Sequence, residues 1–447
     1  MYRLKSPLAA QLEITGACNN ACRHCYNYWR YLETGQRISS DPGEQTLGHF
    51  QQLLGSLIAN EVRTVTITGG EPFLRRDVLF DLVAAAKEAG MKAGVNTNGA
   101  LITMNDIRRL KDVEVDFLLV SLLSDDPAIH DGIANSHSHA LTSEAIANLV
   151  EAGLCAAANM VVSTHNWDRV RQTAMYARGL GLNEISATPV LPCPLAKSHS
   201  ALLLTPEQVK AALNDLLWVQ EQGMMVDVLE PLAHCMFSPE ERTRFAQFLN
   251  HRSCSAGISD MVISPNGDVR PCILATQTCG NLLVDGWRRC WDSLARWCSP
   301  NLLPHGCLNC DAVDECGGGC RIAALASSGS INGKDPYMTQ PLVGVGVVES
   351  DGSTRPKLRP ETVVAFPPAA STRDEEFGCV VFCGRSFMFL DHDGTELLRY
   401  LEDHGAVTLG TIMEDVDISR EDLTDFLGIL ISRGFLALHP SERRRVE

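Results

Sequence analysis

Strand-like and helix-like segments alternate over about the first 190 residues, and this alternation restricts the fold more than any other feature. Longer segments with the period of amphipathic helices separate short apolar runs that are typical of buried strands. Strands that alternate with helices form parallel sheets, so we expect an α/β fold with a curved or closed parallel sheet. Functional residues should then gather at the carboxyl ends of the strands. The expected strands are Leu12–Ile14, Val62–Ile67, Ala93–Asn96, Phe117–Ser121, Ala156–Val162 and Glu184–Ala187.

Three cysteines, Cys18, Cys22 and Cys25, follow the first expected strand with the spacing C-x3-C-x2-C. Their sulfurs can converge on one inorganic centre, and thiolate is the ligand that iron–sulfur clusters prefer. Three ligands leave one iron of a four-iron cluster open to bind another molecule. A zinc loop is the alternative, but zinc sites favour pairs of C-x2-C, or cysteine with histidine, and close at four ligands.

This loop resembles the signature of the radical S-adenosylmethionine (SAM) superfamily, C-x3-C-x-Φ-C, with His24 at the Φ position and Tyr26 just after the motif. The resemblance implies a partial (β/α)6 TIM-like barrel, a 4Fe–4S cluster on Cys18, Cys22 and Cys25, and SAM bound to the open iron. It also places His24 and Tyr26 at the cofactors. In this superfamily one electron splits SAM into methionine and a 5′-deoxyadenosyl radical, which takes hydrogen from an unactivated C–H bond. The protein positions and shields that chemistry.

The segment Gly69-Gly70-Glu71 ends the second expected strand. Glycines let a backbone approach a ligand closely, and a carboxylate accepts a hydrogen bond from an ammonium group. The segment resembles the superfamily's GGE motif, which holds the methionine amino group of SAM. Without the cysteine loop before it, an ordinary strand-to-helix turn with a first-turn glutamate would be the simpler interpretation.

Polar side chains at the ends of later strands are further candidates for SAM binding. Asn98 lies in a segment that resembles the superfamily's ribose-contacting segment, and Ser121 is placed to reach the SAM carboxylate. Asn159 is a candidate for the adenine or ribose. Ordinary turn chemistry is the alternative for Asn98 and Ser121. Relatives tend to read His-Asp-x-x-Arg-Gly after the fourth strand, and residues 130–135 lack that arginine, which leaves the partner of the SAM carboxylate open.

A second cysteine-rich region covers residues 254–320. Cys254 and Cys272 flank an expected hairpin at Asn266-Gly267, and a C-x2-C-x5-C-x3-C run follows. One or two zinc ions are the alternative. The pattern resembles the SPASM extension of radical SAM peptide-modifying enzymes, which binds one or two auxiliary iron–sulfur clusters. The resemblance assigns Cys254, Cys272 and Cys320 to the first cluster and Cys307, Cys310 and Cys316 to the second.

The resemblance is incomplete at its last position. Relatives usually read Asp-Pro-Tyr-Cys, whereas residues 335–338 read Asp-Pro-Tyr-Met. Because Met338 offers only a weak thioether ligand, the second auxiliary cluster has an open iron, takes another ligand, or is absent. Possible donors elsewhere are Cys279, Asp260, Cys379 and Cys383. The remaining isolated cysteines, which we interpret as small buried hydrophobic residues, are Cys155, Cys193 and Cys235.

From Thr339 to about Glu376 the composition shifts to Pro, Thr, Ser and Gly, which indicates a linker and an extended segment. Strand runs at Gly378–Cys383 and Ser386–Leu390 then precede three helical patterns. This order resembles the winged, PQQ-biosynthesis D-type precursor-peptide recognition domain. The resemblance implies that a leader peptide is bound as an added strand at the sheet edge. A winged-helix dimerisation or nucleic-acid module is the alternative.

We therefore expect a radical SAM core barrel at residues 1–235, a SPASM domain at 236–338, a linker at 339–355 and a small winged-helix-like α+β domain at 356–447. A formal charge of −16 argues against nucleic acid as a partner, and no stretch approaches 18 consecutive apolar residues, so we expect no membrane span. Seventeen cysteines without a signal sequence indicate reduced, metal-binding thiols and a cytoplasmic location.

The expected function is that of a radical SAM/SPASM maturase, an oxidoreductase-type enzyme that modifies a ribosomal precursor peptide and takes electrons from a donor such as a flavodoxin or ferredoxin. A sulfatase-maturase-like oxidase that forms formylglycine is one alternative, although Ile273 stands where that family has an acidic residue. Another is a maturase that acts on a folded redox enzyme or assembles a small cofactor from a peptide. The last is a non-catalytic iron–sulfur carrier or peptide-binding scaffold, against which the Gly69–Glu71 motif argues.

Overall fold

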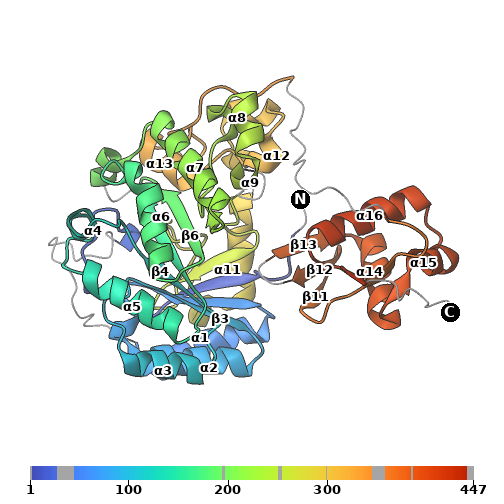
Figure 1. Cartoon of the computed structure of the whole chain (residues 1–447), viewed down its shortest axis with the longest axis horizontal. Coiled ribbons are helices and arrows are strands. Elements are labelled where there is room, and N and C mark those ends of the chain that lie inside the picture. Colours follow the sequence, from blue (N-terminus) through green and yellow to red (C-terminus); the bar gives the residue numbers. More distant parts are fainter. Residues whose placement is uncertain are drawn as a thin grey trace. The chain divides into compact units, whose positions relative to one another are not determined.

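Two units make up the chain in a computed structural model that describes residues 3–27, 45–193, 197–249, 254–298, 300–344, 358–383 and 386–439 (Figure 1). One unit is Ser6–Val348, and the other is Met1–Lys5 together with Glu349–Glu447. The larger unit holds both the predicted barrel and the predicted cysteine-rich domain. Residues 345–357 lie outside the described residues, and they include most of the predicted linker at 339–355. No described helix has the length and apolar character that crossing a membrane requires.

A nine-stranded sheet runs through the larger unit in the order β7-β6-β5-β4-β3-β2-β1-β8-β9. Its first seven strands pair in parallel with their sequence neighbours, which confirms the expected α/β class and adds a seventh strand, β7, that the sequence did not reveal. These strands are β1 (Ala9–Glu13), β2 (Thr64–Thr68), β3 (Lys92–Thr97), β4 (Phe117–Ser121), β5 (Ala156–Val162), β6 (Glu184–Pro189) and β7 (Met225–Asp227).

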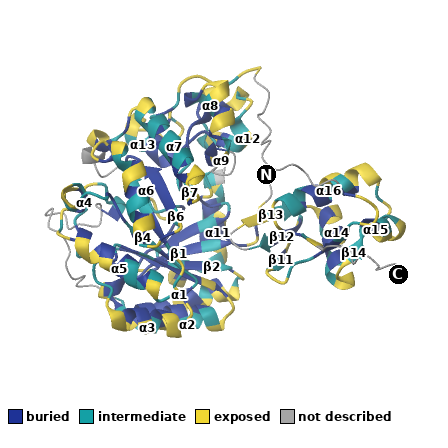
Figure 2. Ribbon diagram, viewed as in Figure 1, coloured by how far each residue is buried: buried dark blue, intermediate teal, exposed yellow. Residues whose placement is uncertain are grey.

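Helices fill the crossovers between these strands, as parallel pairing requires. Figure 2 shows buried strands inside and helices whose outer faces are exposed. The helices therefore cover the apolar strands, and the ends of the strands are the main places where the sheet can carry polar groups. The crossover helices are α1 (Leu47–Ala59), α2 (Arg76–Glu88), α3 (Met104–Asp112), α4 (Pro127–Ala134), α5 (His139–Glu151), α6 (Val170–Gly179) and α7 (Pro206–Glu221).

Local sequence signals set where several helices begin. At α7 the Thr205 side chain accepts a hydrogen bond from the Gln208 backbone N–H, and Gln208 Oε1 accepts one from the Thr205 N–H at 2.9 Å. Pro206 occupies the first turn, where its missing N–H has no intrahelical partner to lose. Ser238 and Glu241 form the same reciprocal pair at α8 (Pro239–Arg244).

The cysteine-rich region joins the sheet of the barrel directly. Strand β8 (Asp260–Ile263) pairs in parallel with β1, and β9 (Val269–Arg270) returns antiparallel after the expected turn at Asn266-Gly267. A strand of the cysteine-rich region therefore lies beside the strand that leads into the first cysteine loop. The remaining helices of this unit are α9 (Ala246–Leu249), α10 (Leu282–Asp285), α11 (Trp287–Leu294), α12 (Val313–Cys316) and α13 (Arg321–Ser328).

Within its described residues, the smaller unit has two three-stranded sheets and three α-helices around its own apolar core. One sheet has the order β14-β10-β15 and the other β11-β12-β13. Its elements are β10 (Val363–Ala365), β11 (Ala370–Glu375), β12 (Gly378–Cys383), β13 (Ser386–Leu390), α14 (His392–His404), β14 (Val407–Thr408), α15 (Leu409–Asp415), α16 (Arg420–Ser432) and β15 (Ala437–His439).

The extended segment expected up to Glu376 contains two strands, β10 and β11, which the sequence did not resolve. Strand β11 has little apolar patterning of its own, and its six residues are instead held by pairing along the whole of β12. Such pairing depends on a partner strand and leaves a weak signal in the segment itself.

Candidate active site

The first cysteine loop is fixed by backbone hydrogen bonds to two neighbouring elements. Its Ala21 and Arg23 N–H groups donate to the carbonyls of Ala134 and Ile133, at 3.0 and 2.9 Å, at the end of α4. On its other side the loop accepts bonds from the segment after β2, with the Glu71 N–H at 2.8 Å from the Ala17 carbonyl. Bonds of this kind hold the loop independently of any ligand.

Gly69 and Gly70 allow the segment after β2 to lie against this loop. Gly69 has φ +131°, and a Cβ on Gly70 would lie 1.8 Å from the Ala17 carbonyl oxygen. The Gly69 carbonyl accepts a hydrogen bond from Asn27 Nδ2 at 2.6 Å. The two glycines therefore serve a close approach between two backbone segments, in addition to the ligand approach expected from the sequence.

Replacing Gly70 with alanine should displace the cysteine loop, because the added methyl group meets backbone that has no freedom to rotate away. We expect at least a tenfold loss of SAM cleavage together with a lower iron content after anaerobic reconstitution. Gly55→Ala in α1 is the matched control, since nothing lies within 4 Å of its added Cβ. Wild-type cleavage and iron content in Gly70→Ala would contradict this account.

The Glu71 carboxylate is buried and holds the neighbouring strand end in place. It accepts hydrogen bonds from the Phe73 N–H at 3.2 Å, from Thr97 Oγ1 at 2.7 Å and from the Asn98 N–H at 2.8 Å. Burial raises the pKa of Glu71, and these three donors act against that shift. In this arrangement the carboxylate orients Asn98, and its expected bond to the SAM ammonium group stays a prediction.

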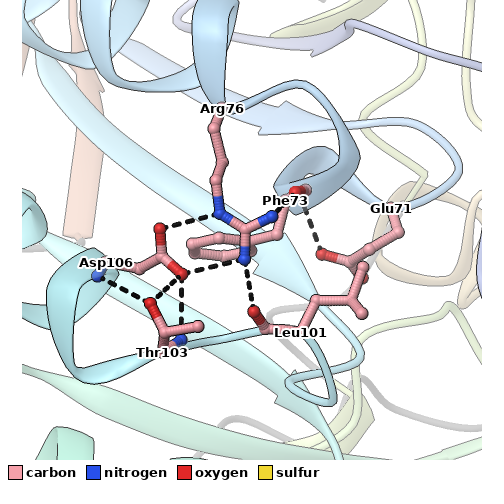
Figure 3. A network of polar contacts seen from close by, with 6 residues as sticks. All are labelled: Glu71, Phe73, Arg76, Leu101, Thr103 and Asp106. Atoms are coloured by element: carbon pink, nitrogen blue, oxygen red, sulfur yellow. Dashed lines mark hydrogen bonds and ion pairs between the residues drawn. The ribbon is translucent and has the colours of Figure 1, made fainter.

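An arginine network stands next to Glu71 (Figure 3). The Arg76 guanidinium donates to both oxygens of Asp106, at 2.8 and 2.9 Å, and also to the carbonyls of Phe73 and Leu101. Asp106 in turn caps α3 together with Thr103. The network thus ties the segment after β2 to the segment after β3, and both segments reach the candidate site.

A cavity of about 330 Å³ opens at the carboxyl ends of the strands, a volume suited to a small-molecule ligand. Of the site residues that the sequence predicted in the barrel, all except Glu71 line this cavity. The predicted residues in the lining are Cys18, Cys22, His24, Cys25, Tyr26, Gly69, Gly70, Asn98, Ser121 and Asn159.

The cavity wall has the donors and acceptors that a polar ligand requires. Asn159 Oδ1 is buried without a hydrogen-bond partner among the described residues, and Asn159 is the register partner of Ser121. A buried unpaired acceptor in a cavity indicates a missing ligand donor. Asn98 Nδ2 lies 3.8 Å from Cys18 Sγ, so the expected ribose segment reaches the first sulfur.

His130 and Glu230 also line the cavity, and the sequence did not assign them a role there. Burial lowers the pKa of His130 to about 4, so its ring is neutral, and Nδ1 accepts the Leu123 N–H at 3.3 Å. Glu230 follows β7, and burial raises its pKa to about 7. No local motif surrounds Glu230, so only the fold could reveal it.

The cysteines of the second region fall into two groups. Cys254, Cys272 and Cys320 lie within electrostatic range of one another, and Glu230 lies within range of Cys272 and Cys320. Burial, followed by the charge of Cys254, raises the pKa of Cys272 to about 12. A buried thiol with a raised pKa ionises near neutral pH when a metal cation binds its sulfur and displaces the proton to solvent, so the chemistry of this group fits a metal centre.

The second group surrounds a separate small cavity. Cys307, Cys310 and Cys316 line it together with Cys235 and Met338. Among the described residues no three His, Cys, Asp or Glu side chains are grouped to hold a single metal ion. A larger iron–sulfur cluster instead requires that its cysteines line a common cavity. Cys307, Cys310 and Cys316 meet this requirement, and so do Cys18, Cys22 and Cys25 at the larger cavity.

The family model of the radical SAM superfamily matches residues 12–188 of this chain. These residues include the first cysteine loop and run from within β1 to within β6. The chain contains a radical SAM domain. Its cofactors are accordingly a 4Fe–4S cluster and SAM, and the cavity with three cysteines and an unpaired amide oxygen fits both. When bound, they supply a carbon-centred radical, and it stays a prediction that the cavity residues orient SAM and exclude water.

Curated relatives align with most of this chain. Mycofactocin maturase of Mycobacterium ulcerans is 28% identical over 366 residues, which cover 80% of this chain and 94% of that protein. PqqA peptide cyclase of Xanthomonas campestris pv. campestris is 27% identical over 396 residues, covering 84% and 100%. The structure of Streptococcus suis SuiB bound to S-adenosylmethionine has a TM-score of 0.60 and 17% identity over 75% of this chain and 78% of that one. This structural likeness shows the shared fold.

Proposed function

We propose that this radical SAM enzyme modifies a ribosomally synthesised precursor peptide, taking hydrogen from one residue with the 5′-deoxyadenosyl radical and installing a crosslink or related modification. One observation carries the proposal. Ile273 and Leu274, which directly follow Cys272, line the same cavity as Cys18, Cys22 and Cys25. The group formed by Cys254, Cys272 and Cys320 therefore adjoins the space where the substrate would react. The names of the maturase and cyclase relatives agree with this substrate class.

Electron balance gives a function to the first of the two cysteine groups, Cys254, Cys272 and Cys320. Removal of one hydrogen atom leaves a carbon radical on the peptide, and closing a new bond requires that one more electron and one proton leave. Cys254, Cys272 and Cys320 would hold an electron acceptor beside the cavity, and Glu230 both lines the cavity and interacts electrostatically with Cys272 and Cys320. Its pKa near neutrality suits it to receive the proton.

The decisive experiment is anaerobic incubation of the reconstituted full chain with SAM, a reduced flavodoxin or ferredoxin, and a short peptide encoded beside its gene. We expect 5′-deoxyadenosine, and a peptide that has lost two hydrogen atoms by mass spectrometry. Absence of 5′-deoxyadenosine would favour an iron–sulfur carrier or scaffold. 5′-Deoxyadenosine without a change in any such peptide would reject the substrate class. Reduced thiols and an oxygen-sensitive cluster suit the cytoplasm.

Glu230 also favours a second candidate, the oxidation of a cysteine or serine to formylglycine. The sequence argued against this activity because Ile273 occupies the expected acidic position. The structure supplies a carboxylate to the same cavity from the segment after β7. Formylglycine formation on a cysteine-containing sulfatase peptide, with none of the crosslinked product, would select this alternative.

We further propose that the smaller unit captures the leader of the precursor peptide at the edge of β13. This strand pairs with β12 on one side only within the described part of the unit. Its Phe387 side chain is 43% exposed and lies 5.5 Å, between ring centroids, from Phe389. An open strand edge beside exposed aromatic side chains suits an added peptide strand.

Changing Phe387 to aspartate should weaken leader binding at least tenfold, because a charge replaces an exposed apolar contact beside the open edge. The measurement is fluorescence anisotropy of a labelled leader peptide titrated with the full chain. Leu438→Asp is the matched control, since Leu438 is 45% exposed on the other sheet of the same unit. Equal affinities for the two variants would remove the β13 edge as the docking site.

A further inference from the structure

The second cysteine group contains a sulfur that the sequence left unassigned. Cys307, Cys310 and Cys316 supply three ligands, and the position that commonly supplies the fourth holds Met338. The cavity between these residues is lined by a further cysteine, Cys235. The expectation that Cys235 is an isolated hydrophobic residue is therefore wrong, because the fold places its side chain at this cavity and leaves it only half buried.

Cys235 comes from a different part of the chain than its neighbours. It lies in a short 3-10 helix, His234–Met236, after β7, whereas Cys307 and Cys310 lie in or just after another, His305–Asn309. The distance along the sequence is more than 70 residues. Cys235 is nevertheless close enough to Cys307 and Cys316 to act on both electrostatically.

Backbone N–H groups point at the sulfurs of this group. The Thr339 N–H donates to Cys235 Sγ at 3.3 Å, the His234 N–H to Cys316 Sγ at 3.4 Å and the Leu342 N–H to Cys310 Sγ at 3.4 Å. Hydrogen bonds of this kind stabilise cluster-bound thiolates and tune their reduction potential. The Cys235 sulfur thus has the same surroundings as two sulfurs that the sequence pattern assigned to a cluster.

Two other possible donors are excluded by their surroundings. The Cys379 side chain is fully buried in the apolar core of the smaller unit. The Asp260 carboxylate accepts a hydrogen bond from Ser259 Oγ at 2.8 Å on β8, and it is absent from the cavity lining. Met338 does line the cavity, but iron–sulfur clusters take thiolate in preference to thioether.

We infer that Cys235 is the fourth ligand of the second auxiliary cluster and takes the role that Met338 cannot fill. This inference extends the proposed function, since it concerns a cluster of the same enzyme. Four thiolates close the cluster, so it carries electrons and offers no open iron to a substrate thiolate.

The test compares iron content and spectra of the anaerobically reconstituted full chain in four variants: Cys235→Ala, Met338→Ala, Cys235→Ala/Met338→Cys and Cys155→Ala. We expect Cys235→Ala to lose about four irons per chain, or to keep them in a cluster whose electron paramagnetic resonance signal changes on adding cyanide. Met338→Ala and Cys155→Ala, the latter at an exposed cysteine, should match the wild type. A cysteine at position 338 should restore the wild-type iron content and spectrum in the double variant.

Wild-type iron content and cyanide response in Cys235→Ala would overturn the inference, as would loss of the cluster in Met338→Ala. Formation of 5′-deoxyadenosine without peptide reports separately on the radical SAM domain. A failed Cys235 result with normal SAM cleavage and peptide modification would therefore reject the ligand and keep the proposed function. Circular dichroism of each variant distinguishes loss of a ligand from loss of the fold.

Discussion

Replacing Cys22 with alanine is expected to abolish SAM cleavage, with 5′-deoxyadenosine falling more than a thousandfold. The cavity offers three cysteines for the cluster of the radical SAM domain, and removing one leaves two. Without the cluster no electron reaches SAM, because the other lining side chains carry no redox chemistry. The measurement is 5′-deoxyadenosine by chromatography after anaerobic incubation with SAM and dithionite, with iron counted in the same sample.

Iron content should fall by about four per chain in this variant, while the two groups in the cysteine-rich region keep theirs. Cys155→Ala is the control, since Cys155 is exposed and lies away from the cavity lining. SAM cleavage at the wild-type rate in Cys22→Ala would mean that the cavity is not where SAM reacts. Normal iron content with lost cleavage would assign Cys22 a role other than ligand.

Replacing Arg270 with methionine is expected to destabilise the larger unit by about 3–5 kcal/mol, the usual cost of leaving a buried charge unpaired. The Arg270 and Glu13 side chains are 1% and 0% exposed, and Nη2 lies 2.6 Å from Oε2. Arg270 also donates to the Ala275 carbonyl at 2.8 Å, close after Cys272. One guanidinium therefore connects β1, which leads into the first cysteine loop, with a loop that lines the same cavity.

The measurement is the midpoint of urea unfolding of the anaerobically purified chain, followed by tryptophan fluorescence. Glu13→Gln/Arg270→Met should recover part of the loss, since removing both charges leaves neither buried alone. Arg288→Met is the matched control: Arg288 is 95% exposed in its pair with Asp292, and such a pair contributes well under 1 kcal/mol. Equal midpoints for Arg270→Met and Arg288→Met would show that the buried pair adds little.

The barrel was predictable because its signals are local and repeated. Each strand of β1–β6 is an apolar run with a helical segment after it, and parallel pairing follows from that order. The sequence did not predict strand β7, because Met225–Asp227 is short and half exposed and its position depends on pairing with β6. The sequence also did not predict strand β11, because its position depends on hydrogen bonds to β12.

The residues of the candidate site differ in the same way: some follow from a local pattern and others only from the tertiary structure. Ligands that share one loop, such as Cys18, Cys22 and Cys25, are visible from spacing alone, because neighbours in a short loop are neighbours in space. The sequence by itself therefore determined the radical SAM domain, its cofactors and ten of the residues that line the cavity. Glu230 and Cys235 were decided only by the tertiary structure, which brings the segment after β7 against cysteines far along the chain. No spacing rule predicts that these segments pack together, because their contact results from burial of the apolar surface of the whole sheet and its helices.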